Sequence, residues 1–120
     1  MFDIRSLSQF LGVSNRIVRW EYSDSKIAWV KIAGKMRFRE NDVKDYLSQN
    51  YFCLDIHESI NPDQPELPLK KPLDTAIELG IPPTTLRLRK DEGQIKYLRI
   101  RGQIRYRPAD ILEFKQPQTI

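Results

Sequence analysis

Two groups of small polar and basic side chains in this 120-residue chain have the chemistry to bind nucleic acid. Guanidinium, hydroxyl and carboxamide groups hydrogen-bond to phosphate oxygens and to the edges of guanine and adenine. Ser14–Arg16 form the first group and Thr84–Arg87 the second. The candidate DNA-contacting residues are Ser14, Asn15, Arg16, Arg19, Lys35, Arg37, Arg39, Thr84, Thr85, Arg87, Arg101, Gln103, Arg105 and Arg107.

The charge of the chain is distributed unevenly, in a way that suits a polyanionic partner. The net charge is +4, with +3 in residues 1–48, −3 in residues 49–70 and +4 in residues 71–120. Each phosphate that a cation neutralises releases condensed counterions, and that release drives binding to nucleic acid. A solvated basic surface gives the same charge, so the motifs have to carry the argument.

Catalytic and metal-binding chemistry has little support in the sequence. His57 is the only histidine and Cys53 the only cysteine, so no Cys/His set can hold zinc and no disulfide can form within the chain. We interpret His57, which lies between Asp55 and Glu58, as solvated and not as part of an acid–base pair. With no phosphate-cradling glycine loop among five glycines, we predict a non-enzyme without cofactor or metal.

The same composition bears on the compartment. A single cysteine fits a reducing environment. No apolar run approaches the roughly 20 residues that span a bilayer, and the first residues lack a signal-peptide core. We expect a cytoplasmic protein without membrane contact.

The chain repeats itself at a fixed offset of 68 residues without a gap, as from Gly12 to Gly80. Identical residues at this offset include Leu11 and Leu79, Arg19 and Arg87, Ile27 and Ile95, Ile32 and Ile100, Gly34 and Gly102, Arg37 and Arg105, Arg39 and Arg107, and Asp42 and Asp110. Because glycines, apolar residues and arginines all match in one register, we infer an internal duplication.

The sequence of each copy predicts two short helices joined by a glycine turn. In the first copy we expect a helix from a cap at Ser6 to Gly12, and a second helix capped by Ser14. In the second copy Asp74 takes the first cap, and Pro83 suits the first turn of the second helix. A helix, a tight turn and a second capped helix form a helix-turn-helix.

A β-hairpin and a closing helix follow in each copy. We predict hairpins over residues 26–39, turning at Gly34, and over residues 95–107, turning at Gly102. Their basic residues cluster at the tip, which places positive charge on a protruding wing. The closing helices begin near Asn41 and Pro108.

The fold class predicted from these elements is α+β, with two tandem small winged helix-turn-helix units. Unit 1 covers residues 1–48, a Pro-containing acidic linker covers residues 49–70, and unit 2 covers residues 71–120. In the linker, Tyr51–Ile56 is apolar, and a strand, a helix extension or a contact surface would each explain it.

The residues of both copies resemble the MerR-like winged helix-turn-helix superfamily, and more closely its excisionase-like branch. In the first copy the resemblance rests on Leu11-Gly12-Val13-Ser14, Ile17-Val18-Arg19-Trp20, Gly34-Lys35-Met36-Arg37-Phe38-Arg39 and Asp42-Val43. In the second it rests on Leu79-Gly80-Ile81, Thr84-Thr85-Leu86-Arg87, Ile95, Gly102, Arg105-Tyr106-Arg107 and Asp110-Ile111.

The resemblance implies a DNA-binding protein of a phage or mobile element in bacteria. Its second helix would lie in the major groove and its wing against the backbone or the minor groove. The expected function is that of an excisionase, which organises or bends double-stranded DNA for an integrase or recombinase. A transcriptional repressor and a replication or packaging adaptor are the alternatives, and self-association along DNA stays open.

Overall fold

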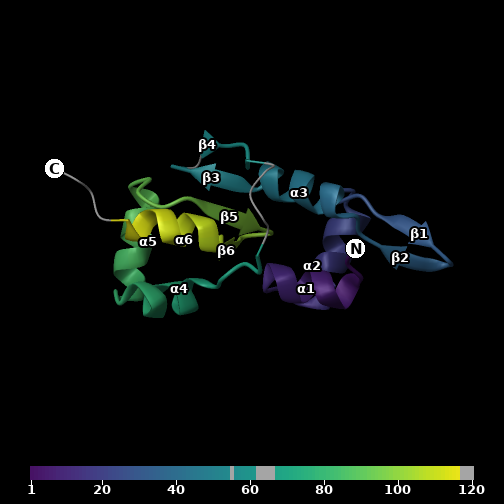
Figure 1. The fold of residues 1–120 in the computed structure, drawn as a ribbon, viewed down its shortest axis with the longest axis horizontal. Coiled ribbons are helices and arrows are strands. Elements are labelled where there is room, and N and C mark those ends of the chain that lie inside the picture. Colours follow the sequence, from purple (N-terminus) through teal and green to yellow (C-terminus); the bar gives the residue numbers. More distant parts are fainter. Residues whose placement is uncertain (55, 62–66, 117–120) are drawn as a thin grey trace.

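The computed structural model describes residues 1–54, 56–61 and 67–116, and it confirms the predicted α+β class. Figure 1 shows an elongated molecule, with extents of 55 × 27 × 23 Å. Its elements are α1 (Ile4–Leu11), α2 (Asn15–Ser23), β1 (Val30–Ile32), β2 (Lys35–Arg37), α3 (Glu40–Gln49), β3 (Tyr51–Cys53), β4 (Ile56–His57), α4 (Pro72–Leu79), α5 (Pro83–Asp91), β5 (Tyr97–Ile100), β6 (Gln103–Arg105) and α6 (Pro108–Lys115).

The same order of elements occurs twice, 68 residues apart. We call α1, α2, β1, β2 and α3 the first repeat, and α4, α5, β5, β6 and α6 the second repeat. The agreement extends to isolated backbone bridges, since Phe2 pairs with Phe38 and Lys70 pairs with Tyr106 at the same offset. Two helices, a hairpin and a closing helix therefore follow one another in each repeat.

The first helix of each repeat begins earlier than the cap residue expected from the sequence. Asp3, not Ser6, caps α1, and the two side chains form a reciprocal capping box. Lys71, not Asp74, occupies the cap position of α4. Proline at the next residue starts α4, because a fixed φ suits the first helical position.

The glycine turns and the second helices follow the sequence prediction. Gly12 and Gly80 end α1 and α4 with φ of 69° and 68°, in the left-handed region that glycine adopts at little cost. Ser14 caps α2 by accepting a hydrogen bond from the backbone N–H of Ile17. Pro83 is the first residue of α5.

The strands form two antiparallel sheets. β1 and β2 make a two-stranded sheet that extends from one end of the molecule (Figure 1). The other sheet has the order β4-β3-β5-β6, so the segment between the repeats pairs directly with the second hairpin. Of the three possibilities for Tyr51–Ile56, the structure shows strands at Tyr51–Cys53 and at Ile56 and a contact surface with β5, while Asp55 lies outside the described residues.

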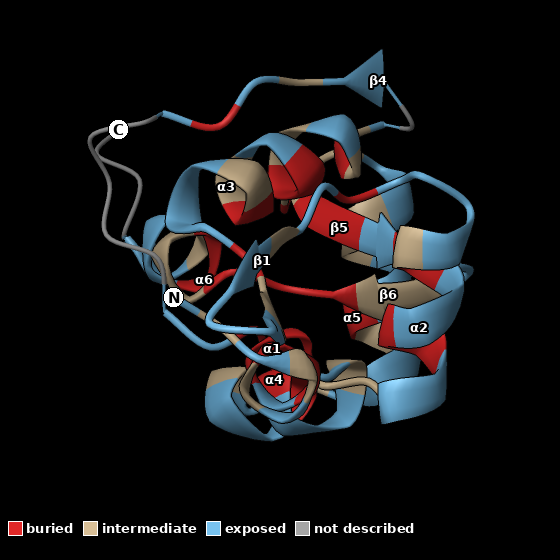
Figure 2. Cartoon of the chain, turned by 90° about the vertical axis from the view of Figure 1, so that its right-hand side faces the viewer, coloured by how far each residue is buried: buried red, intermediate tan, exposed pale blue. Residues whose placement is uncertain are grey.

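Two apolar clusters form the interior, and the first of them draws on both repeats. Leu98 and Ile100 of β5 are fully buried in a cluster whose other members come mostly from α1, α2 and α3. Ile60 and Leu69 join the same cluster from the segment predicted to be a linker. Figure 2 shows the buried face of β5 beside the helices. Of the linker prolines, Pro62 and Pro65 lie outside the described residues.

Candidate nucleic-acid interface

Helix α2 turns one polar face to solvent. Ile17, Val18 and Glu21 are buried and fix how the helix rotates on its neighbours. At 100° per residue, the opposite face then carries Arg16 and Arg19, and both are exposed. The remaining exposed side chains of the helix are Asn15, Trp20 and Ser23.

The N-terminal end of α2 places its polar groups at the surface. Ser14 and Asn15 are both exposed. Asn15 Oδ1 lies 2.7 Å from the Ser8 hydroxyl, which holds the carboxamide in one orientation. A carboxamide at this exposed position can pair with adenine at N6 and N7.

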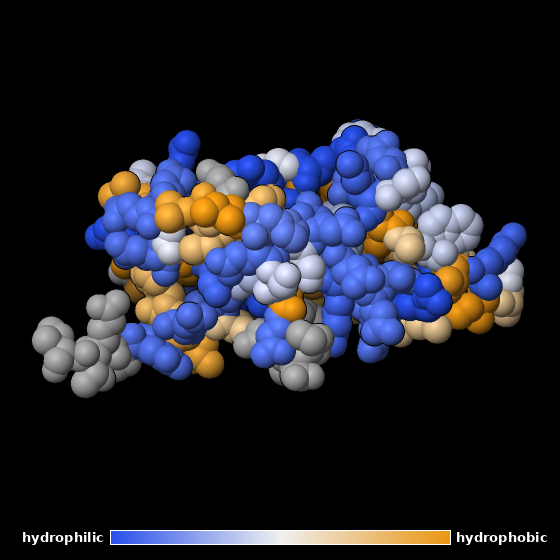
Figure 3. Space-filling model, turned by 90° about the horizontal axis from the view of Figure 1, so that it is seen from above, coloured by the Kyte–Doolittle hydropathy of each residue, from blue (hydrophilic) through white to orange (hydrophobic). Residues whose placement is uncertain are grey.

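The first hairpin carries its charge at an exposed tip. Ala33 and Gly34 form the turn with φ of 52° and 79°, as a two-residue hairpin with a right-handed twist requires. Lys31, Ile32 and Lys35 around the turn are all exposed. Figure 3 shows hydrophobic and hydrophilic side chains together at the end of the molecule where this hairpin lies.

The cations on these two elements are free for a ligand. Among the described residues, none forms an ion pair with Arg16, Arg19, Lys31 or Lys35. Two other candidates of this hairpin are engaged: Arg37 Nη1 donates to its neighbour's carbonyl, and Arg39 pairs with Asp42 at 2.7 Å. Within the described part of the chain, α2 and the hairpin therefore present four exposed cations that have no ion pair.

The candidates on α5 are less uniform. Thr84 and Arg87 are exposed, and Thr85 is partly buried. The last turn of the helix is neutralised, because Arg89 pairs with Glu92 and Lys90 pairs with Asp91. Arg87 is the cation of α5 without an ion pair in the described part of the chain.

The second hairpin does not protrude as the sequence suggested. Arg105 is only 7% exposed, and its guanidinium donates to the carbonyls of Leu11 and Gly12 in the first repeat. Burial lowers the pKa of Arg105. Gln103 is partly buried and accepts from Arg105 at 2.7 Å. The expectation that Arg105 sits on an exposed wing is wrong, because β5 and β6 of the second repeat pack against the first repeat.

Arg107 is also a buried residue and not a surface cation. It is 3% exposed, its guanidinium lies 5.3 Å from the Tyr51 ring centre, and Nη1 lies 3.9 Å from Asp110 Oδ2. Tyr51 donates to Asp110 Oδ1 at 2.6 Å, and burial raises the pKa of Asp110. Arg107 therefore belongs to a buried polar cluster that joins the intervening segment to α6, and its predicted contact with DNA has no exposed surface.

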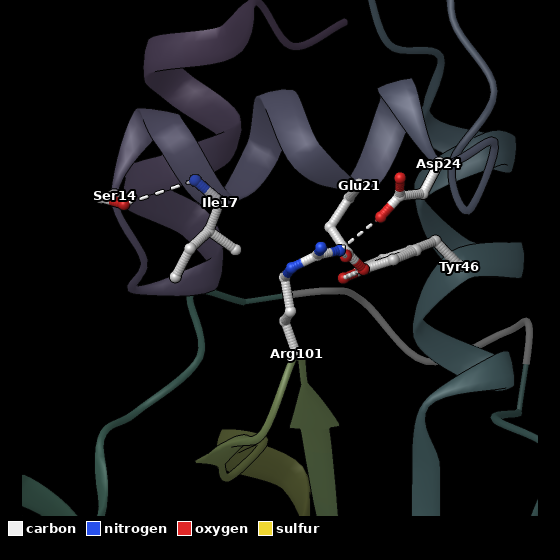
Figure 4. A network of polar contacts seen from close by, with 6 residues as sticks. All are labelled: Ser14, Ile17, Glu21, Asp24, Tyr46 and Arg101. Carbon is white, nitrogen blue, oxygen red and sulfur yellow. Dashed lines mark hydrogen bonds and ion pairs between the residues drawn. The ribbon is translucent and has the colours of Figure 1, made fainter.

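Arg101 reaches across to α2 from the turn after β5 (Figure 4). Its Nη1 lies 2.9 Å from Glu21 Oε1 and 2.7 Å from Asp24 Oδ2. The two carboxylates raise the pKa of Arg101. Tyr46 donates to the other Glu21 oxygen at 2.6 Å, so three elements meet at this buried carboxylate.

Trp20 lies between two arginines on the exposed side of α2. The Arg101 guanidinium is 5.1 Å from the Trp20 ring centre, and that of Arg16 is 6.0 Å from it. Sequence reasoning missed this arrangement, yet it left a signal. At the repeat positions of Glu21 and Arg101 stand Arg89 and Ala33, so the opposite charges occur only in the combination that meets in space.

Neither a membrane-spanning helix nor a metal-binding cluster is found among the described residues. There, none of the helices combines the length and the apolar composition needed to cross a bilayer. The same ranges hold no cluster of three or more His, Cys, Asp and Glu side chains.

Comparisons of the chain with protein-family models, with curated proteins and with solved structures found no match. The case for a function therefore rests on the residues and on their arrangement.

Proposed function

We propose that the chain binds double-stranded DNA in a sequence-specific manner and that the first repeat is its principal reading unit. In this proposal α1, Gly12 and α2 act as a helix-turn-helix, and β1 with β2 acts as a wing. The observation that carries it is the set of four exposed cations on α2 and on the first hairpin that form no ion pair with any described residue. A surface of this kind gains free energy from counterion release at the DNA backbone.

We propose that the position of each side chain on this surface determines whether it contacts base edges or phosphates. Arg16 and Asn15, near the beginning of the helix, are proposed to contact base edges, because the N-terminal part of a recognition helix enters the major groove. Arg19 and Lys35 are proposed to bind phosphates on either side of that groove, and Lys31, which the sequence argument left out, joins them. In the second repeat Thr84 and Arg87 are available for a weaker additional contact.

The biological role that we propose is that of an excisionase-like factor, which organises or bends DNA for an integrase or recombinase. Support comes from the resemblance of both repeats and from the fixed packing of one repeat on the other. A DNA permutation assay tests it: bending of the bound site supports the architectural role, and an undistorted site favours a transcriptional repressor.

A specific observation favours the adaptor alternative for the second repeat. Leu73 and Ile77 are 59% and 71% exposed on one face of α4, where the first repeat has Arg5 and Gln9. Apolar side chains gathered on one helix face are typical of a protein contact. DNA binding by the first repeat and protein binding by the second are compatible functions.

Selection of binding sites from random duplexes, followed by mobility-shift titration, tests the proposed function. We expect Arg16→Ala to weaken binding to the selected site by about 1–3 kcal/mol and to relax the preference at one base pair. The matched control is Lys115→Ala, because Lys115 lies on α6 and pairs with Glu78. A wild-type chain that binds no duplex at low salt, or equal losses in both variants, contradicts the proposal.

A further inference from the structure

We infer that the tip of the second hairpin is part of the DNA-binding surface of the first repeat, so that α2 lies between two hairpins. This inference rests on the proposed function and deepens it. It assigns to Arg101 a phosphate contact made beside α2, instead of a contact made by an independent second wing. The chain would then cover one continuous DNA site.

The first step is the placement of the second hairpin along α2. Arg105 holds β6 to the carbonyl of Gly12, in the turn before α2, and Arg101 holds the turn after β5 to Asp24, directly after α2. Two anchors at opposite ends of one helix lay the tip of the hairpin alongside that helix. Leu98 and Ile100, both fully buried in the first cluster, fix it there by apolar packing.

The second step is the placement of the first hairpin on the other side of α2. The Tyr22 ring contacts Phe38, which follows β2, and Trp29, which precedes β1, at centroid distances of 6.3 and 6.4 Å. Tyr22 and Asp24 lie 200° apart around the helix axis by helical geometry. The exposed side chains of Arg16 and Arg19 fall in the arc between them, and so between the two hairpins.

The third step is electrostatic. Asp24 places an exposed carboxylate beside the face of α2 that is proposed to meet DNA, where its negative charge repels phosphate, and Glu21 adds a buried carboxylate on the opposite face. Arg101 compensates both of them and remains 38% exposed. Its contacts to the two carboxylates use Nη1 only, so within the described residues Nε and Nη2 keep donors for a phosphate oxygen.

Mobility-shift titrations at several salt concentrations test this inference. The probe is a random-sequence duplex of 30 base pairs, which leaves about one helical turn of DNA on each side of a site one turn long. We expect Arg101→Ala to weaken binding several-fold and to reduce the salt slope by about one, as the loss of one phosphate contact does. Arg101→Lys should retain the slope, and Lys115→Ala is the matched control, because it removes a cation of α6 that pairs with Glu78.

A double variant separates direct contact from simple neutralisation. Arg101→Ala with Asp24→Asn removes the arginine together with the exposed carboxylate that it compensates. Binding that stays weak supports a phosphate contact by Arg101, and full recovery overturns it. An Arg101→Ala chain that binds as tightly as the wild type also overturns the inference, provided that its thermal unfolding is unchanged.

The proposed function and this inference fail differently. If the wild type binds no duplex, the proposed function fails and takes the inference with it. If the wild type binds and Arg16→Ala weakens binding while Arg101→Ala does not, only the inference fails. Hydroxyl-radical footprinting adds a second criterion, since the inference predicts one continuous protected tract.

Discussion

The two repeats share an order of elements but differ in what they do with their charges. In the first repeat the cations of α2 and of the hairpin tip have no acidic partners among the described residues, whereas Arg89, Lys90, Lys96, Arg101 and Lys115 of the second repeat form ion pairs. The second copy has the larger net positive charge in the sequence, yet the first presents more free charge. Net charge is therefore a poor guide to a binding surface when ion pairs are unknown.

The hairpins differ in the same sense. β1 and β2 extend into solvent (Figure 1), while β5 packs against the first repeat and contributes Leu98 and Ile100 to its apolar cluster. The difference in exposure can be followed at single positions, since side chains that are equivalent in the repeat are exposed in the first hairpin and buried in the second.

The first prediction concerns Ile100 and its repeat equivalent Ile32. Ile100 is fully buried and Ile32 is 44% exposed. Ile100→Ala should lower the free energy of unfolding by about 2–5 kcal/mol, because it opens a cavity in the shared apolar cluster. Ile32→Ala should change it by less than about 0.5 kcal/mol. Urea denaturation measures both, and equal effects would contradict the buried position of the second hairpin.

The second prediction compares Arg105 with Arg37. Both guanidiniums donate to the carbonyl of the preceding residue at 2.7 Å, but only Arg105 also bonds to Leu11 and Gly12. Arg105→Ala should lower the free energy of unfolding by about 1–3 kcal/mol, since the buried carbonyl of Leu11 and the partly buried carbonyl of Gly12 lose their charged donor. Arg37→Ala should leave the unfolding midpoint nearly unchanged. A larger loss of stability in Arg37→Ala would reverse the comparison.

The third prediction concerns the two turn glycines. Both lie near φ = +69°, so alanine at either position should destabilise the chain by roughly 1–2 kcal/mol. A Cβ at Gly12 would also lie 3.1 Å from Arg105 Nε, whereas a Cβ at Gly80 would meet no described atom within 4 Å. Gly12→Ala should therefore be the more destabilising substitution in thermal unfolding. Equal shifts would show that Arg105 yields without loss.

Local features of the fold could be predicted from the sequence, and long-range contacts could not. Ser14, Pro83 and the glycine turns act within a few residues of the chain, so their types indicated where helices begin and end. The pairing of β3 with β5 joins residues far apart in sequence, and no local pattern encodes it. The capping residue of α1 was misplaced because Asp3 and Ser6 both fit the role and form one reciprocal motif.

The candidate surface divides in the same way. Arg16, Arg19 and Lys35 were predicted to be available, and the structure leaves them exposed. Arg105 and Arg107 were predicted as basic residues of a second protruding wing, and they are buried because Arg105 packs on the first repeat and Arg107 on Tyr51 and Asp110. Equivalence in a repeat conveys local conformation, but the neighbours of each copy determine its exposure.

The most direct test of the proposal that the first repeat supplies the DNA-binding charge is the salt dependence of binding. For a random-sequence duplex, the double variant Arg19→Ala with Lys35→Ala should reduce the slope of log binding constant against log salt concentration by about two. Each of the two substitutions removes one phosphate contact. Lys96→Ala with Lys115→Ala removes two cations of the second repeat that pair with Glu58 and Glu78, and it should leave the slope unchanged. A reduced slope in the second variant alone would contradict the account.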